Sequence, residues 1–205
     1  RVDLKRTIAA NLHTARPDAD GTLRLAPEHL RYLGRSRRSM DWHVVLVVDV
    51  SGSMEVSVIH SALVAAILAG LPALSVHFLA FSTEVIDLTD RVDDPLGLLL
   101  EVSVGGGTDI GRGLRAAREV LRVPSRSIVL VVSDFEEGVS VGSLLGEVRA
   151  LVGSGAKVLG VSALDDEGHA QVNRAIAEQV VAAGMPVAAL TPTELARWVA
   201  EQVQR

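Results

Sequence analysis

The sequence predicts an α/β fold: a doubly wound, mainly parallel sheet with one antiparallel edge strand and helices on both faces. Three observations lead to it. Continuous apolar, β-branched runs at 44–48 and 127–133 are typical of strands buried on both faces. Helical periodicity fills the segments between such runs. The 205 residues, 48% of them hydrophobic, are enough to bury a core without disulfide or metal staples.

The expected elements alternate along the chain. Strands are expected at 44–48, 75–81, 84–88, 127–133, 157–161 and 186–190. Helices are expected at 54–70, from Ile110 to Leu121, at 141–152, around Val172 to Val180, and from Pro192 to Val203. Only Ser82 and Thr83 separate the second strand from the third, which predicts an antiparallel hairpin at a sheet edge.

We expect two parts, an N-terminal extension at 1–41 and a main domain at 42–205. In the extension, the apolar spacing from Leu4 to Leu12 indicates a short amphipathic helix, and 21–25 indicates a short strand. An arginine-rich connector follows, with Arg31, Arg35, Arg37 and Arg38.

Charge and composition narrow the class of partner. Residues 1–41 hold nine basic and five acidic groups, a net charge of +4. Residues 42–205 hold eleven basic and twenty acidic groups, a net charge of −9, so the whole chain carries −5. Aromatic residues are 3%, so the basic cluster lacks stacking platforms and we expect no nucleic-acid partner. The absence of cysteine excludes thiolate metal sites and favours the cytoplasm. The longest apolar run, 62–72, is too short to span a bilayer, and we expect no membrane partner.

Oxygen-bearing side chains collect where open parallel sheets bind ligands, at the carboxyl ends of strands. The first strand leads into D-V-S-G-S, the strand at 127–133 into S-D, and a G-G-G-T-D loop precedes the helix at Ile110. The five donors are Asp49, Ser51, Ser53, Thr108 and Asp134. Because no histidine or cysteine accompanies them, the set suits a hard divalent cation, Mg²⁺ first, with Mn²⁺ and Ca²⁺ as alternatives.

These three elements, in this order, resemble the metal-ion-dependent adhesion site of von Willebrand factor A (VWA) domains, and the resemblance covers the main domain. It implies that Ser51 and Ser53 are direct ligands and that Thr108 is a switchable ligand. It implies that Asp49 and Asp134 set the charge and orient bound water. It also implies a coordination position left for a partner's Asp or Glu.

A narrower resemblance is to the bacterial CoxE-like VWA proteins, which work beside MoxR-type AAA+ ATPases. It rests on D-L-K-R-T-I at 3–8, D-V-S-G-S-M at 49–54, G-G-T-D-I at 106–110 and V-S-D-F-E-E-G at 132–138. The connector departs from the pattern, because A-P-E-H-L at 26–30 interrupts the arginine-rich run. This resemblance implies a cytoplasmic adaptor that binds a MoxR-like ATPase or its client.

Five further residues stand beside the expected site and have two interpretations. They suit contact with metal-bound water or the rim of a partner-binding face. Asp109 equally suits the N-cap of the next helix, and the other acidic residues equally suit solvated loops. The five are Gly107, Asp109, Glu136, Glu137 and Asp165.

We expect a protein-binding module and no enzyme. The D-x-D pair of haloacid-dehalogenase-like phosphatases is absent, because Ser51 stands where the second acid belongs. No G-K-[ST] occurs. Two alternatives remain: an extracellular adhesion-type VWA domain, which the missing cysteines disfavour, and a metal-dependent hydrolase, for which no general base can be named.

Overall fold

The computed structural model describes residues 4–18, 23–25, 27–29, 42–70, 74–92, 94, 97, 106–164 and 170–204. Contacts divide the chain into two compact units, Arg1–Ser39 and Met40–Arg205. This division falls two residues before the boundary expected between 41 and 42. The arginine-rich connector and Asp165 lie outside the described residues.

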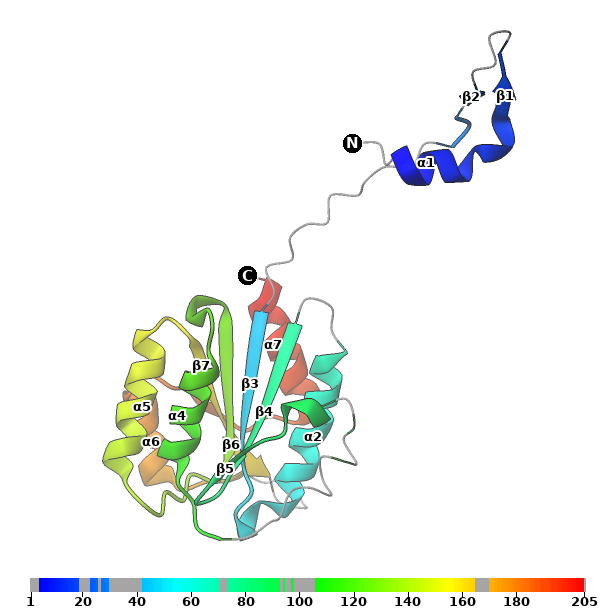
Figure 1. Ribbon diagram of the computed structural model, residues 1–205. Helices are drawn as coiled ribbons and strands as arrows, with labels where there is room; N and C mark the ends of the chain where they lie inside the picture. Colours follow the sequence, from blue (N-terminus) through cyan, green and yellow to red (C-terminus); the bar gives the residue numbers. More distant parts are fainter. Residues whose placement is uncertain are drawn as a thin grey trace. The chain divides into compact units, whose positions relative to one another are not determined.

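In the larger unit, the described strands form a seven-stranded sheet that is parallel at its centre (Figure 1). Its four long strands lie side by side in the order β4 (Leu74–Phe81), β3 (Trp42–Asp49), β6 (Ser127–Ser133) and β7 (Lys157–Leu164). The short strand β5 (Val85–Asp87) pairs antiparallel with β4 and closes one edge, as the tight Ser82–Thr83 turn predicts. At the other edge, β8 (Ala170–Gln171) pairs antiparallel and β9 (Val187–Ala188) parallel with β7.

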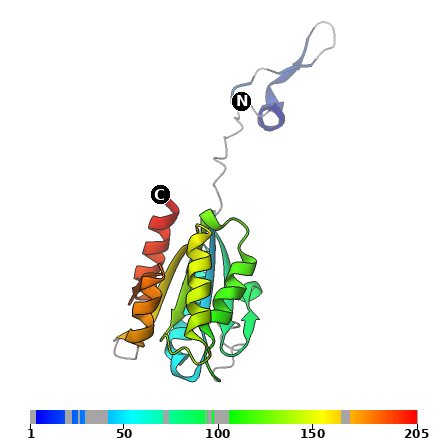
Figure 2. The same cartoon turned by 90° about the vertical axis from the view of Figure 1, so that its left-hand side faces the viewer.

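Helices cover both faces of the sheet, because the central strands are apolar on both sides. Helices α2 (Glu55–Ala69) and α7 (Pro192–Gln204) pack on one face. Helices α4 (Ile110–Val120), α5 (Val141–Gly153) and α6 (Arg174–Ala182) pack on the other (Figure 2). Alternate residues of β3 enter the two cores: Val44, Leu46 and Val48 face α2, and Val45 and Val47 face α4.

The α4 helix approaches the sheet closely at a glycine. A Cβ on Gly113 would lie 2.9 Å from the Phe81 ring and 3.0 Å from Val47 Cγ1. Only glycine fits there without movement of buried neighbours. The N-terminus of α4, which carries the Thr108 loop, is therefore held against the ends of β3 and β4.

The smaller unit is built around a buried asparagine. Its described elements are α1 (Leu4–Ala10), the 3₁₀ turn η1 (Leu12–Thr14) and the antiparallel pair β1 (Ala15–Pro17) and β2 (Leu23–Leu25). The Asn11 amide donates to the carbonyls of Thr7 (2.7 Å) and His29 (2.9 Å). Its Oδ1 accepts from the backbone N–H of Glu28 (2.8 Å) and His29 (3.0 Å). One fully buried polar side chain thus joins the helix to the segment that follows β2.

The differences from the sequence expectations lie at chain ends and sheet edges. The strand at 127–133 has the expected bounds, but β7 continues three residues beyond 161, and only two residues of 186–190 pair. The short strands β1 and β8 were not expected. Edge and hairpin strands of two or three residues carry too little apolar periodicity to be recognised, and their pairing depends on neighbours distant in sequence. None of the described helices is both long and apolar enough to cross a membrane.

Candidate metal centre

The candidate site forms where β3 and β6 end side by side. The parallel register pairs Val48 with Val132, so Asp49 and Ser133 end adjacent strands. Asp134 is the next residue after β6, and Ser51 lies two residues beyond Asp49. The structure therefore brings together Asp49, Ser51 and Asp134, three of the five expected donors.

Asp49 is fully buried and held by two hydrogen bonds. Its Oδ1 accepts from the Ser51 backbone N–H at 2.9 Å, and its Oδ2 accepts from the Ser133 hydroxyl at 2.7 Å. Burial raises the pKa of the Asp49 carboxyl, and the negative charge of Asp134 raises it further, whereas the groups of Ser51 and Ser133 act to lower it. The contacts fix the carboxylate but leave it with a neighbouring like charge and no cationic partner among the described residues.

Asp134 is 6% exposed, and both its side chain and its backbone are tied to the surrounding loops. Its Oδ1 accepts from the backbone N–H of Glu136 at 3.0 Å. Its carbonyl accepts from the N–H of Asn173 at 2.7 Å, which joins the loop after β6 to the start of α6. The Asn173 amide also donates to the Glu136 carboxylate at 3.1 Å.

A left-handed residue turns the chain just after Asp134. Phe135 is fully buried and has a φ of 60°, a region that non-glycine residues enter at some cost. Its N–H donates to the Ser133 hydroxyl at 2.9 Å. A Cβ on Gly160 of β7 would lie only 2.7 Å from the Phe135 ring, so the ring needs a glycine on the neighbouring strand.

Thr108 is 7% exposed and reaches this edge through the loop before α4. Two backbone hydrogen bonds place it: the Gly138 N–H donates to the Thr108 carbonyl, and the Asp109 N–H donates to the Ser82 carbonyl, both at 2.9 Å. The Glu137 carboxylate strengthens the connection between the Thr108 loop and the loop that carries Gly138. One oxygen accepts from the Ile110 N–H at 2.9 Å, and the other accepts from the N–H groups of Val139 and Ser140 at 3.0 and 2.9 Å.

Glu137 therefore joins the loop after β6 to the first turn of α4. Its negative charge also lies at the positive end of that helix. From the sequence, Glu137 was expected at the rim or in a solvated loop, and its link between the two loops was not expected. The D-F-E-E-G string offers no local signal for this link, because the Ile110 amide lies 27 residues away.

The remaining rim residues have separate environments. Asp109 caps α4, since its side chain accepts from the Arg112 N–H at 2.8 Å, and Arg112 in turn donates to the Thr83 carbonyl. Gly107 is exposed beside Thr83. Glu136 is exposed and accepts a hydrogen bond from the Asn173 amide. The Ser53 backbone lies in the 3₁₀ turn η2 (Gly52–Met54), and its side chain is outside what the structure describes.

One specific observation indicates that these donors suit a hard cation. The Ser51 hydroxyl is buried beside the Asp49 carboxylate, close enough to help lower the pKa of that carboxyl, but no hydrogen bond of standard geometry joins it to any described residue. A buried hydroxyl without a partner costs free energy that a ligand recovers. In the described part of the chain, no group of three or more His, Cys, Asp or Glu could hold a metal by itself. A cation here would therefore depend on hydroxyl oxygens together with Asp49 and Asp134.

This sheet order, with helices on both faces and the antiparallel strand β5 at one edge, defines a VWA-like α/β domain. A family model described as "VWA domain containing CoxE-like protein" matches residues 1–199. The chain belongs to this family. The match includes the N-terminal unit as well as the main domain.

Comparisons with individual proteins agree with this assignment. The chain is 44% identical over 203 residues to "Uncharacterized protein YehP" of Escherichia coli (strain K12), covering 98% of this chain and 53% of YehP. It thus spans about half the length of that relative. The fold resembles BatB from Bacteroides thetaiotaomicron (TM-score 0.61, 16% identity, 80% of this chain and 100% of BatB). It also resembles a von Willebrand factor type A protein from Catenulispora acidiphila (TM-score 0.55, 18% identity, 80% and 42%).

Proposed function

We propose that the edge formed by β3, β6 and the α4 loop binds a divalent cation, Mg²⁺ first, with Mn²⁺ and Ca²⁺ as alternatives. The residues that would hold it are Asp49, Ser51, Ser53, Thr108 and Asp134. The single observation that carries the proposal is the buried Ser51 hydroxyl next to Asp49, which makes no hydrogen bond of standard geometry to any described residue. Oxygen donors with two carboxylates are what hard divalent cations prefer.

Hydrogen bonds within the chain orient the proposed ligands. The Ser51 N–H and the Ser133 hydroxyl orient Asp49, the Glu136 N–H orients Asp134, and Glu137 holds the Thr108 loop in place. Because only two carboxylates are present, they balance a divalent charge without exceeding it. When bound, the ion would supply an electrophilic position able to accept an external carboxylate.

We further propose that the function is binding and not catalysis: an Asp or Glu of a partner protein would complete the metal site. Membership of the CoxE-like family supports a VWA-type role. The MoxR-type AAA+ ATPase is the partner that the sequence resemblance to CoxE-like proteins implies. The leading partner is thus a MoxR-like ATPase or its client, and the expected place of action is the cytoplasm.

The metal proposal is tested by thermal unfolding of the EDTA-stripped chain titrated with Mg²⁺, Mn²⁺ and Ca²⁺. At 100 times the dissociation constant, binding to the native state adds about 2.7 kcal/mol, a rise in melting temperature of roughly 5–10 °C. The rise should disappear in Ser51→Ala and Asp134→Asn. Glu201→Gln, which removes one exposed carboxylate on α7, is the matched control and should keep the full rise. No cation-dependent rise at millimolar concentrations would refute the proposal.

The partner proposal is tested by calorimetry against a purified MoxR-type ATPase from the same organism, with Mg²⁺ and with EDTA. Binding should require the cation and should be lost in Ser51→Ala while Glu201→Gln binds normally. Equal affinity in EDTA would show that the contact does not pass through this site. Phosphoester turnover abolished by Asp49→Ala would instead establish a hydrolase.

A further inference from the structure

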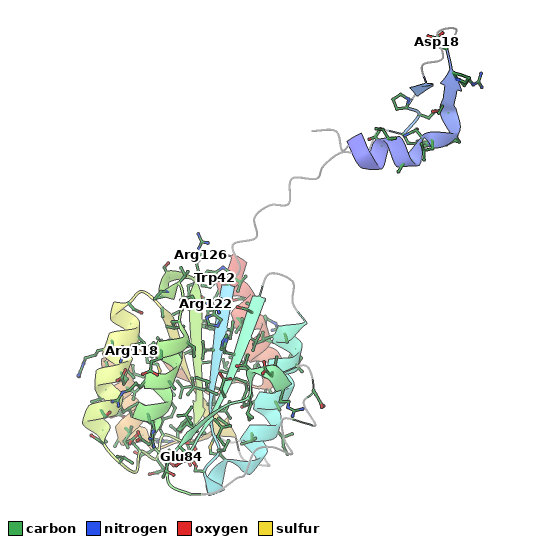
Figure 3. The ribbon with its side chains drawn as sticks, in the orientation of Figure 1. Asp18, Trp42, Glu84, Arg118, Arg122 and Arg126 are labelled. Atoms are coloured by element: carbon green, nitrogen blue, oxygen red, sulfur yellow. The ribbon has the colours of Figure 1, made fainter. Side chains whose placement is uncertain are left out.

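A second polar cavity lies at the opposite end of the same sheet, where β3 and β4 begin. It has a volume of about 570 Å³. Its polar lining comes from His43 on β3, Ser75 and His77 on β4, and Arg122 and Arg126 on the segment between α4 and β6. Figure 3 shows Arg122 and Arg126 near Trp42, at the end of the sheet away from Glu84. The cavity shares no residue with the candidate metal centre.

The two histidines form a coupled pair. Parallel register pairs His43 with Ser75 and Val45 with His77, so both rings extend the row of side chains that faces α4. His43 Nε2 and His77 Nδ1 are 2.7 Å apart, and the rings meet edge to face with centroids 4.5 Å apart. One ring therefore donates a hydrogen bond to the other, and the tautomers decide which ring is the donor.

The pair is electrostatically unsatisfied. Burial, His77 and Arg122, in that order, lower the pKa of His43 to about 4. His43 Nδ1 is buried and makes no hydrogen bond to any described residue. Arg122 thus places positive charge near His43, and no carboxylate is among the described residues that line the cavity.

Among the described residues, the two arginines have no carboxylate partner. Neither Arg122 nor Arg126 makes an ion pair or hydrogen bond to a described residue, whereas Arg115 and Arg118 on the preceding helix both bind Glu147. Arg122 is exposed and Arg126 half-buried, and both line the cavity. Their positive charges favour an anion there over a metal cation.

We propose that this cavity binds the phosphate group of a small molecule, either inorganic phosphate or a phosphate monoester. Arginine presents paired donors that match phosphate oxygens, and the Ser75 hydroxyl adds a further donor. The volume lies within the range of small-ligand sites and exceeds what a bare phosphate fills, so the structure favours a monoester with a compact organic part. This inference is independent of the metal proposal.

Calorimetry on the full chain tests it with three probes at constant ionic strength: inorganic phosphate, glucose 6-phosphate and glucose. Both phosphates should bind and glucose should not. Binding of the monoester more tightly than phosphate would identify a monoester as the ligand class, and the reverse order would identify inorganic phosphate. Imidazole NMR signals of His43 and His77 should move on titration, because an adjacent anion raises the pKa of histidine.

The double variant Arg122→Gln/Arg126→Gln should weaken phosphate binding by at least about tenfold, since each removes charge-assisted hydrogen bonds. Arg149→Gln/Arg197→Gln removes the same net charge from exposed positions on α5 and α7 and should bind normally. Each single cavity variant is measured too, so that a folding defect in the double variant leaves the test intact. Absence of binding by either phosphate, or equal weakening in the control, would overturn the proposal.

Discussion

The Ser133 hydroxyl donates a 2.7 Å hydrogen bond to Asp49 Oδ2 across the boundary between two adjacent parallel strands, 84 residues apart in sequence. The Ser133 hydroxyl oxygen also accepts a hydrogen bond from the Phe135 N–H at 2.9 Å. One buried hydroxyl thus fixes the first carboxylate of the candidate metal centre and the turn that carries the second. Ser133 precedes Asp134 in the S-D string, yet its importance comes from this contact and not from any expected ligand role.

Ser133→Ala should lower both stability and cation affinity. The change leaves the Phe135 N–H and one Asp49 oxygen without partners in a fully buried place, at an expected cost of about 2–3 kcal/mol. Urea unfolding in EDTA measures the stability, and a Mg²⁺ titration measures the affinity. Ser162→Ala is the matched control. Ser162 lies on β7, in register with Ser133 on β6, but the buried Ser162 hydroxyl has no hydrogen bond in the described structure. It should be nearly neutral, and equal losses in the two variants would contradict the prediction.

Glu137→Ala should weaken cation binding more than it lowers stability. The variant releases three backbone N–H groups and separates the Thr108 loop from the loop after β6. We expect Mg²⁺ affinity to fall roughly tenfold, equivalent to about 1.4 kcal/mol. Glu136→Ala removes a neighbouring carboxylate that makes a single exposed contact with Asn173 and should change affinity little. If both variants bind Mg²⁺ like the native chain, Glu137 does not position Thr108.

Gly160→Ala should destabilise the domain by about 1–3 kcal/mol. The new methyl group would approach the buried Phe135 ring to 2.7 Å and Val187 to 3.1 Å, so the turn after Asp134 must shift. Thermal unfolding measures the effect. Gly146→Ala is the control, because its Cβ would meet nothing within 4 Å, and helix propensity should make it neutral or stabilising by up to about 1 kcal/mol. A neutral Gly160→Ala would show that the Phe135 ring can move freely.

Stability should fall on acidification between pH 6.5 and 4 because of His43. Its pKa is about 4 in the folded chain and 6.5 when unfolded, so in this window the unfolded state binds the extra proton. The contribution is complete above pH 6.5 and amounts to about 1–2 kcal/mol after allowance for solvent screening of a partly exposed ring. Over this range, the urea midpoint should depend less steeply on pH in His43→Gln than in the native chain. The slope should be unchanged in His13→Gln, whose side chain is 62% exposed. An unchanged slope in His43→Gln would contradict the assignment.

The sequence alone determined the α/β class, the bounds of the strand at 127–133 and the hairpin formed by β4 and β5. These follow from patterns that are local: continuous apolar runs, helical spacing and a two-residue turn. It also predicted five donors at one edge of the sheet, because the carboxyl ends of parallel strands meet there: Asp49, Ser51, Ser53, Thr108 and Asp134.

Only the tertiary structure decided which neighbours those residues have. Four contacts join segments between 25 and 84 residues apart. They are the Ser133–Asp49 hydrogen bond, the Glu137–Ile110 hydrogen bond, the approach of Phe135 to Gly160 and the His43–His77 pair. Such contacts depend on strand register and on the packing of loops, and neither leaves a periodic trace in the chain. For the same reason, the histidines looked like ordinary core or surface residues until adjacent strands placed them 2.7 Å apart, beside two arginines that make no ion pair with a described residue.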